Sequence, residues 1–213
     1  MDLKEILNYV ERGNAKKTKE LVTKAIEEGI PAVKILNEGL ISAMSAVGER
    51  FKEGEIYVPE MLIAGRAMSQ GMKILEPILT KTGVKAVGRA VMGTVKGDLH
   101  DIGKNLVIMM LKGTGIEVYD LGVDVPKEVF AQKAEELHAD IIAMSALLTT
   151  TMPAMKDVVE ELKKRNIRNK YIVMIGGAPV TDEYAKEIGA DYYTADAATA
   201  AEVAKKALIE RQN

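Results

Sequence analysis

The chain has 213 residues, of which 47% are hydrophobic and 28% charged, and its net charge is -2. This balance is typical of a soluble globular protein and gives no electrostatic reason to expect binding to nucleic acid or to an anionic membrane. Apolar runs fall short of the roughly 18 residues that a membrane helix needs, and the first residues do not resemble a signal peptide, so we expect a cytoplasmic protein. Cysteine is absent, and His100 and His138 are the 2 histidines, which excludes thiolate and multi-histidine metal centres.

Helical periodicity dominates the N-terminal part of the sequence. Apolar residues at helical spacing predict four helices, around Ile6–Val10, over Thr18–Ile26, over Val33–Phe51 and from about Val58 to Leu79. The periodicity then breaks over 83–88, which is the expected linker. We therefore predict a helical domain over 1–82 and a second domain over 89–213.

Strand and helix patterns alternate after the linker. The expected strands are 90–95, 117–121, 141–145, 171–175 and 191–193, and the expected helices lie near 103–112, 126–137, 152–165, 181–187 and 196–210. Five βα units joined by right-handed crossovers predict a doubly wound parallel five-stranded sheet of the flavodoxin-like, Rossmann-like type. His100 then follows the carboxyl end of a strand, at the edge where open α/β sheets bind ligands.

The loop after the first of these strands carries the densest chemistry of the chain. Asp98 and His100 lie two residues apart, so the carboxylate can hold one imidazole nitrogen while the other is free to ligate a metal. Gly103 would let a flat, bulky ligand approach the backbone. Taken alone, Asp-x-His-x-x-Gly more often reflects a capping aspartate and a hydrogen-bonded loop histidine. Asp101 is the expected helix N-cap, and His138 is expected at a helix C-terminus.

Three spaced motifs favour the metal-binding interpretation. The stretch Thr94–Asn105, which reads TVKGDLHDIGKN, closely resembles the cobalamin-binding signature of methionine synthase and of small corrinoid methyl-carrier proteins. Ser145-Ala146-Leu147 resembles the Ser-x-Leu motif of that family, and Ile175-Gly176-Gly177-Ala178 resembles its glycine pair. The resemblance covers nearly the whole chain.

The resemblance implies a cofactor and a set of contacts to it. The cofactor would be cobalamin or a related cobamide, in its methylcob(III)alamin and cob(I)alamin forms, with His100 as the axial cobalt ligand. Asp98 would orient His100, and Thr151 would extend this relay where methionine synthase has a serine. The other expected contacts in this domain, mostly to the nucleotide tail of the cofactor, are Gly97, Leu99, Gly103, Ser145, Leu147, Thr149, Gly176 and Gly177, with Gly93 on the same path.

The helical domain would cover the reactive upper face of the cofactor. The segment Glu53–Glu60 resembles the family's loop that enters the cap helices, which would place Tyr57 over that face. The small-residue run 64–68 predicts either cofactor contact through Ala67 and Met68 or tight helix–helix packing, and the sequence does not separate the two.

The function implied by the resemblance is that of a non-catalytic carrier subunit in one-carbon metabolism. It would carry a methyl group on cobalt from a donor-specific methyltransferase, of the methylamine, betaine or methanol type, to an acceptor methyltransferase that uses tetrahydrofolate or coenzyme M. A reductive activase is a third expected partner. The alternatives are the cobalamin-binding subunit of a B12-dependent mutase, which would not need the helical cap, a cobalamin-dependent light sensor, which would need an output segment, and a signalling domain without cofactor.

Overall fold

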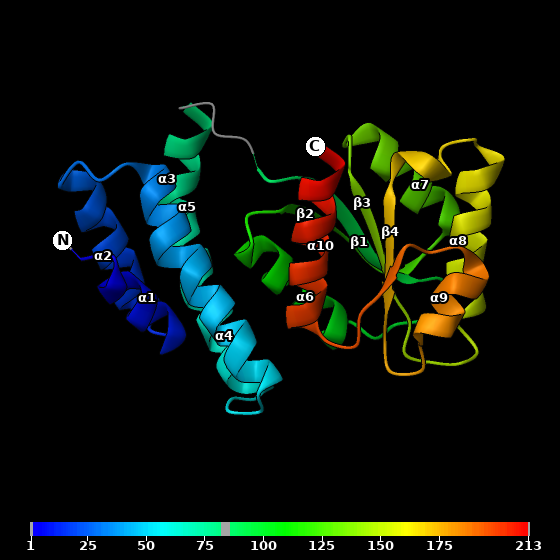
Figure 1. Cartoon of the computed structure of the whole chain (residues 1–213), viewed down its shortest axis with the longest axis horizontal. Coiled ribbons are helices and arrows are strands. Elements are labelled where there is room, and N and C mark those ends of the chain that lie inside the picture. Colours follow the sequence, from blue (N-terminus) through cyan, green and yellow to red (C-terminus); the bar gives the residue numbers. More distant parts are fainter. Residues whose placement is uncertain (1, 82–85, 213) are drawn as a thin grey trace. The chain divides into compact units, whose positions relative to one another are not determined.

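The computed structural model describes residues 2–81 and 86–212 (Figure 1). It divides into two compact units, one formed by Met1–Lys85 with Gly113–Gly115 and one by Ala86–Lys112 with Ile116–Asn213. Residues 83–85 of the predicted linker lie outside the described residues, so the exact domain boundary stays a prediction. Within the described residues, none of the helices combines the length and the apolar character needed to cross a bilayer.

The N-terminal unit is helical, as predicted. Its elements are α1 (Lys4–Glu11), α2 (Ala15–Glu27), a continuous helix of three segments, α3 (Ala32–Lys34), η1 (Ile35–Ile41) and α4 (Ser42–Lys52), and α5 (Val58–Lys81). The Asn14 side chain begins α2 by accepting a hydrogen bond from the Lys17 N–H (3.0 Å). The apolar faces meet in a core that includes the fully buried Ile6, Leu40 and Met61.

The middle segment of the long helix departs from the prediction. Residues Ile35–Ile41 form a π-helix, in which each turn holds more residues than an α-helical turn. Leu40 is buried, as the helical pattern predicted, and so are Ile35 and Ile41, whereas Leu36, which the pattern placed on the apolar face, is only half-buried. Two glycines let helices pack closely here, because a Cβ atom on Gly71 would lie 2.9 Å from the Leu40 side chain and one on Gly39 would lie 3.2 Å from Ile6.

The second unit is built on a five-stranded parallel sheet in the order β2-β1-β3-β4-β5. The strands are β1 (Arg89–Val95), β2 (Glu117–Val125), β3 (Ile141–Ser145), β4 (Ile172–Gly176) and β5 (Tyr192–Tyr193). The helices are α6 (Ile102–Gly113), α7 (Lys127–Glu136), α8 (Pro153–Lys164), the short 3-10 turn η2 (Arg168–Lys170), α9 (Asp182–Ile188) and α10 (Ala197–Gln212). This strand order is that of flavodoxin, which confirms the predicted fold.

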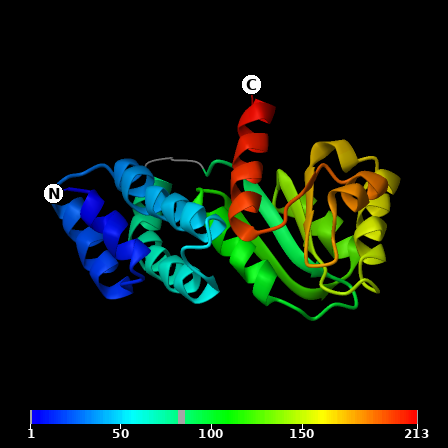
Figure 2. The ribbon, with the colours of Figure 1, turned by 60° about the horizontal axis from the view of Figure 1, so that its bottom comes forward.

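Helices cover both faces of the sheet. Figures 1 and 2 show α6 and α10 on one face and α7, α8 and α9 on the other. Val91, Ile142 and Val173 are partners across β1, β3 and β4, and they belong to the core cluster that contains Phe130 of α7 and Met155 of α8. The next residues along these strands, Met92, Ala143 and Met174, are also buried, and they point to the other face, that of α6 and α10.

Strand β2 runs past its predicted end at Leu121 and finishes at Val125. Its pairing with β1 shifts register between Met92 and Val95, as in a β-bulge. Gly122 and Asp124 both adopt positive φ angles there, 87° and 54°. The strand prediction was wrong at this end because a glycine after an apolar run usually ends a strand, whereas here it bends the strand and lets it continue.

Candidate functional site

The predicted motifs meet at the carboxyl ends of β1, β3 and β4. Thr94, Ser145 and Gly176 are direct partners across these three strands. The loop 96–101 follows β1, the loop 146–152 follows β3, and Gly177 follows β4. The parallel order of the sheet thus brings the three motifs to one edge, as predicted.

Asp98 connects two of these loops through four hydrogen bonds. Its Oδ1 atom accepts from the His100 N–H (3.1 Å) and pairs with His100 Nδ1 (3.0 Å). Its Oδ2 atom accepts from the Leu147 N–H (2.7 Å) and from Thr151 Oγ1 (2.7 Å). The side chain is fully buried, so every contact that stabilises it comes from the protein.

These contacts keep Asp98 ionised. Burial by itself raises the pKa of a carboxyl group, but the hydrogen bonds from Leu147, Thr151 and His100 outweigh it and hold the pKa of Asp98 well below its usual range. Thr151 Oγ1 also lies 2.9 Å from the Leu148 carbonyl oxygen. Its single hydrogen can serve one acceptor at a time, and the carboxylate is the stronger of the two.

The ionised Asp98 determines what His100 can do. A carboxylate can only accept, so the neutral imidazole donates its Nδ1–H to Asp98 and leaves a lone pair on Nε2. No other described residue is paired with the ring in the structure, and the side chain is 54% exposed. Among the described residues there is no cluster of three or more His, Cys, Asp or Glu side chains that could enclose a metal ion. The arrangement therefore suits a metal that needs one protein nitrogen, because a macrocycle supplies the rest.

Exposed apolar side chains surround the imidazole loop. Leu99 and Ile102 are 72% and 71% exposed, and Leu147 and Leu148 are 41% and 43% exposed. We call these four residues the apolar rim. Large apolar side chains grouped on a surface mark a place where another molecule binds, and a flat corrin ring fits such a surface. The sequence reasoning named Leu99 and Leu147 but missed Ile102 and Leu148, although two leucines in a row after a buried strand were a signal.

The glycines at this edge have different reasons for lacking a side chain. A Cβ atom on Gly103 would meet nothing within 4 Å, so the fold does not need a glycine there and the space is open to a ligand. Gly177 has a φ of +133°, and a Cβ atom would lie 1.8 Å from the Ala146 carbonyl oxygen, so the fold itself requires this glycine. Gly97 has a φ of +84°, and a Cβ on Gly176 would lie 3.2 Å from the Thr194 carbonyl oxygen.

The expectation for Gly93 is wrong. A Cβ atom at this position would lie 3.0 Å from Phe130 and 3.0 Å from Val125, in the core between the sheet and α7. Gly93 makes room for Phe130, and it faces away from the row formed by Thr94, Ser145 and Gly176, because successive side chains of a strand point to opposite faces.

The remaining predicted contacts are distributed over the two units. Ser145 is half-buried at the end of β3, and Thr149 is exposed in the following loop. In the helical unit, Tyr57 is 68% exposed just before α5, while Ala67 and Met68 are buried. Contact of these residues with a cofactor stays a prediction.

Two residues predicted at helix ends lie there in the structure, and their roles at those ends stay predictions. Asp101 directly precedes α6, and its carboxylate accepts a hydrogen bond from the Asn105 side chain (3.2 Å). His138 is exposed and has a φ of 51° just after the end of α7. An ion pair that the sequence reasoning missed joins the buried Lys104 of α6 to the exposed Asp120 of β2 (2.6 Å). Partial burial raises the pKa of Asp120, but the hydrogen bonds from Lys104 and from the Gly122 N–H together outweigh it and hold that pKa below its usual range.

A parallel flavodoxin-type sheet that presents a carboxylate-held imidazole and an apolar rim at its carboxyl edge defines the class of cobalamin-binding proteins. Residues 88–204 match the model of the B12 binding domain, and residues 2–76 match a second model, also described as a B12 binding domain. The chain is a member of the corrinoid methyl-carrier family, and its cofactor is a corrinoid.

Three relatives illustrate this membership. A corrinoid protein of Desulfitobacterium hafniense strain Y51 is 42% identical, with 97% of each chain covered. Dimethylamine corrinoid protein 3 of Methanosarcina acetivorans is 41% identical, over 98% of this chain and 99% of that protein. The crystal structure of the methanol:cobalamin methyltransferase complex MtaBC from Methanosarcina barkeri contains a chain that superposes with a TM-score of 0.85 and 29% identity, over 96% of this chain and 78% of the other. Neither the mutase nor the light-sensor alternative has a counterpart among these three proteins.

Proposed function

We propose that the chain carries a methyl group on the cobalt of its corrinoid between two methyltransferases. One partner takes the methyl group from a small donor, and the other passes it to tetrahydrofolate or coenzyme M. The observation that carries this proposal is the pair of Asp98 and His100, in which a buried carboxylate fixes one imidazole nitrogen and leaves Nε2 without a protein partner among the described residues. A reductive activase is a third proposed partner, which would restore the cofactor after adventitious oxidation.

The donor is proposed to be a methylated amine. The dimethylamine corrinoid relative supports this class, because it is 41% identical over nearly the whole of both chains. The structural neighbour from the methanol complex supports the same carrier role at 29% identity. Methanol is therefore the second candidate, and betaine, which the sequence reasoning also considered, is the third.

Each residue of the site has a proposed task. The bound corrinoid supplies a cobalt centre that accepts and releases a methyl group. His100 would bind the cobalt through Nε2, and Asp98 would keep the proton on Nδ1 and fix the orientation of the ring. The apolar rim excludes water from the edge of the macrocycle. The open space at Gly103 admits it close to the backbone of α6.

Reconstitution tests this proposal directly. The purified chain, incubated with hydroxocobalamin, should retain one corrinoid per chain after gel filtration and show the visible spectrum of a histidine-ligated corrinoid. His100→Ala should shift the main absorption bands and reduce the affinity only partly, because the contacts to the rest of the cofactor remain. His138→Ala is the matched control, since it removes the other histidine and should leave the spectrum unchanged. A colourless wild-type protein would refute the proposal.

The donor class needs a second experiment. The reduced, reconstituted chain is mixed with a purified dimethylamine-specific or methanol-specific methyltransferase and the matching donor, and methylation is followed by absorbance. Faster methylation with dimethylamine than with methanol supports the first candidate, and the reverse order would replace it by the second.

A further inference from the structure

The loop that carries Asp98 and His100 is held by two residues that have no role in the site described so far. The first is Thr94, which is fully buried near the end of β1. Its hydroxyl donates a hydrogen bond to the main-chain carbonyl of His100 (2.7 Å). This bond fixes the backbone of the histidine itself, whereas Asp98 fixes the ring and the N–H.

The second is Asp124, near the end of β2. Its N–H donates to the Asp98 carbonyl oxygen (2.9 Å), and its Oδ1 accepts from the Gly97 N–H (2.7 Å). Both bonds join the loop after β1 to the last residues of β2, at the β-bulge. The residue takes a left-handed conformation, with a φ of 54°, which aspartate adopts at lower cost than most residues.

We propose that Thr94 and Asp124 are positioning residues for the axial ligation of the corrinoid. Together they form a backbone clasp, which holds the main chain at Gly97, Asp98 and His100 before any ligand arrives. Because the clasp orders the loop before the cofactor binds, binding does not lose free energy to the ordering of the loop. This inference rests on the proposed function, in that it takes His100 as the axial ligand.

Two matched pairs of variants separate the clasp from simple packing. Thr94→Val removes the hydroxyl and keeps the shape of the side chain, while Thr94→Ser keeps the hydroxyl. Asp124→Gly removes the acceptor for the Gly97 N–H and tolerates the left-handed backbone, while Asp124→Asn keeps an oxygen acceptor at the same place. The first member of each pair should loosen the loop, and the second should behave like the wild type.

The first readout uses the cofactor-free protein. Long-range proton–nitrogen NMR spectra distinguish the two imidazole tautomers, and the 2 histidines of the chain make assignment simple. The wild type, Thr94→Ser and Asp124→Asn should show His100 with its proton on Nδ1, and Thr94→Val and Asp124→Gly should show a mixture of tautomers. Amide exchange should become faster at Gly97 in Asp124→Gly and at His100 in Thr94→Val.

The second readout is titration with hydroxocobalamin, followed by the absorbance of the histidine-ligated form. Thr94→Val and Asp124→Gly should lose affinity by on the order of 10-fold, as residues behind a metal ligand typically do, and the conservative variants should lose little. Wild-type affinity together with unchanged His100 signals in both Thr94→Val and Asp124→Gly would overturn the clasp. A wild-type protein that binds no hydroxocobalamin would instead overturn the proposed function, and the NMR comparison distinguishes the two failures.

Discussion

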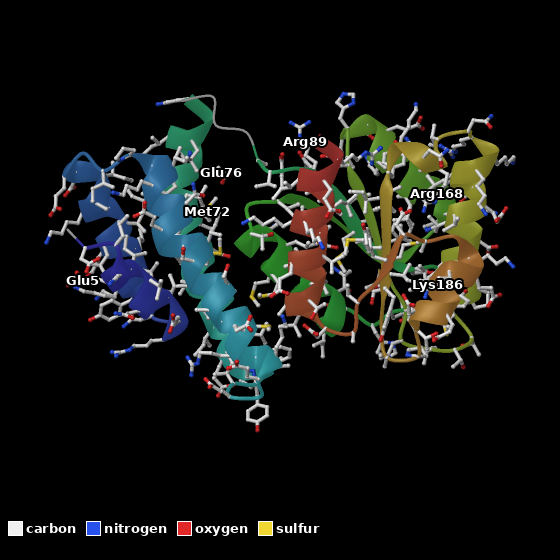
Figure 3. The ribbon with its side chains drawn as sticks, in the orientation of Figure 1. Glu5, Met72, Glu76, Arg89, Arg168 and Lys186 are labelled. Carbon is white, nitrogen blue, oxygen red and sulfur yellow. The ribbon has the colours of Figure 1, made fainter. Side chains whose placement is uncertain are left out.

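Aspartate carboxylates lie at both ends of the parallel sheet, but they stabilise the strand ends at one end and hold the His100 imidazole at the other. At the amino end, Asp140 accepts from the Arg89 N–H (2.8 Å) and Asp191 accepts from the Val173 N–H (2.7 Å). The Arg168 guanidinium lies 2.9 Å from Asp191 and also donates to the Gly189 carbonyl oxygen. Figure 3 labels Arg89, where β1 begins, and Arg168, in the turn before β4. Here carboxylates and arginines satisfy the free groups at the strand ends.

At the carboxyl end, the buried Asp98 carboxylate holds one nitrogen of the His100 ring and leaves the other nitrogen without a partner among the described residues. Asp98 engages two loops and one side of the His100 ring, and the other side of the ring stays exposed beside the apolar rim. The comparison indicates where function lies. The groups at the amino end stabilise the sheet. The groups at the carboxyl end fix the loops and leave the His100 imidazole accessible to a bound molecule.

Substitution of Gly177 should cause the largest loss of stability. In Gly177→Ala, the new Cβ atom would lie 1.8 Å from the Ala146 carbonyl oxygen, at a φ of +133°. The overlap is with backbone, so no side-chain rotation relieves it, and we expect a loss of at least about 3 kcal/mol in the free energy of unfolding. Urea unfolding of the cofactor-free protein measures it. A loss below about 1 kcal/mol would mean that the loop after β4 is adaptable.

Asp98→Asn should impair the carboxyl end without such damage. Asparagine has one oxygen acceptor, so it cannot accept all of the bonds that Leu147, Thr151 and His100 donate. We expect a loss of about 10- to 100-fold in corrinoid affinity or transfer rate. Equilibrium titration with hydroxocobalamin gives the value, and affinity within about twofold of wild type would show that the carboxylate charge is dispensable.

The same residue predicts a pH dependence. The pKa of Asp98 is lower in the folded chain than in the unfolded one, so its contribution to the free energy of unfolding is complete above the unfolded pKa of about 3.9. That contribution is lost as the pH falls below this value towards the folded pKa. The wild type should therefore lose more stability than Asp98→Asn between about pH 4 and pH 2 in urea unfolding. The same loss of stability with falling pH in both proteins would contradict the lowered pKa of Asp98.

Gly103→Ala should separate binding from folding. A Cβ at this position meets nothing within 4 Å, and alanine in place of glycine stabilises a helix by up to about 1 kcal/mol. The cofactor-free variant should be as stable as the wild type or more stable. Its corrinoid affinity should nevertheless fall by roughly tenfold, because the methyl group occupies space that the ligand needs. Unchanged affinity would show that the ligand does not approach α6 here.

Arg89→Ala should have the smallest effect. The Arg89–Glu117 pair is 3.1 Å long, and both side chains are largely exposed, so it stabilises the sheet by no more than about 1 kcal/mol. The Arg89 N–H keeps its bond to Asp140 in the variant. Thermal unfolding and hydroxocobalamin titration should both stay close to the wild type, and a loss of affinity would break the distinction between the two ends of the sheet.

Much of the fold was predictable because its signals are local. Each strand of the sheet is a short apolar run, and each crossover helix has its own periodicity, so five βα units imply the parallel order. The position of the motifs at one edge follows from that order. The π-helix at Ile35–Ile41 was not predictable, since apolar residues spaced three and four apart fit an α-helix equally well.

The site was predictable in its motifs and less so in its connections. The pairing of Asp98 with His100 follows from a separation of two residues, but the bond from the Leu147 N–H joins positions 49 residues apart and depends on the sheet. Asp124 carries no signal in the sequence, because its role follows from the bulge that extends β2. Ile102 and Leu148 resemble core residues in a linear pattern, and only their exposure identifies them.

The row of partners across the carboxyl ends of the strands has a consequence for shape. Thr94, Ser145 and Gly176 stand side by side on β1, β3 and β4, and paired residues of parallel strands point to the same face. Side-chain volume falls at every step along this row, from a branched side chain to a small one to none. The layer of side chains on this face of the sheet therefore becomes thinner towards β4. At Gly176 the Thr194 carbonyl oxygen closes the space, because it would lie 3.2 Å from a Cβ atom there. A molecule lying across the strands would therefore come closest to the main chain of the sheet at β4, up to the limit set by the Thr194 carbonyl oxygen.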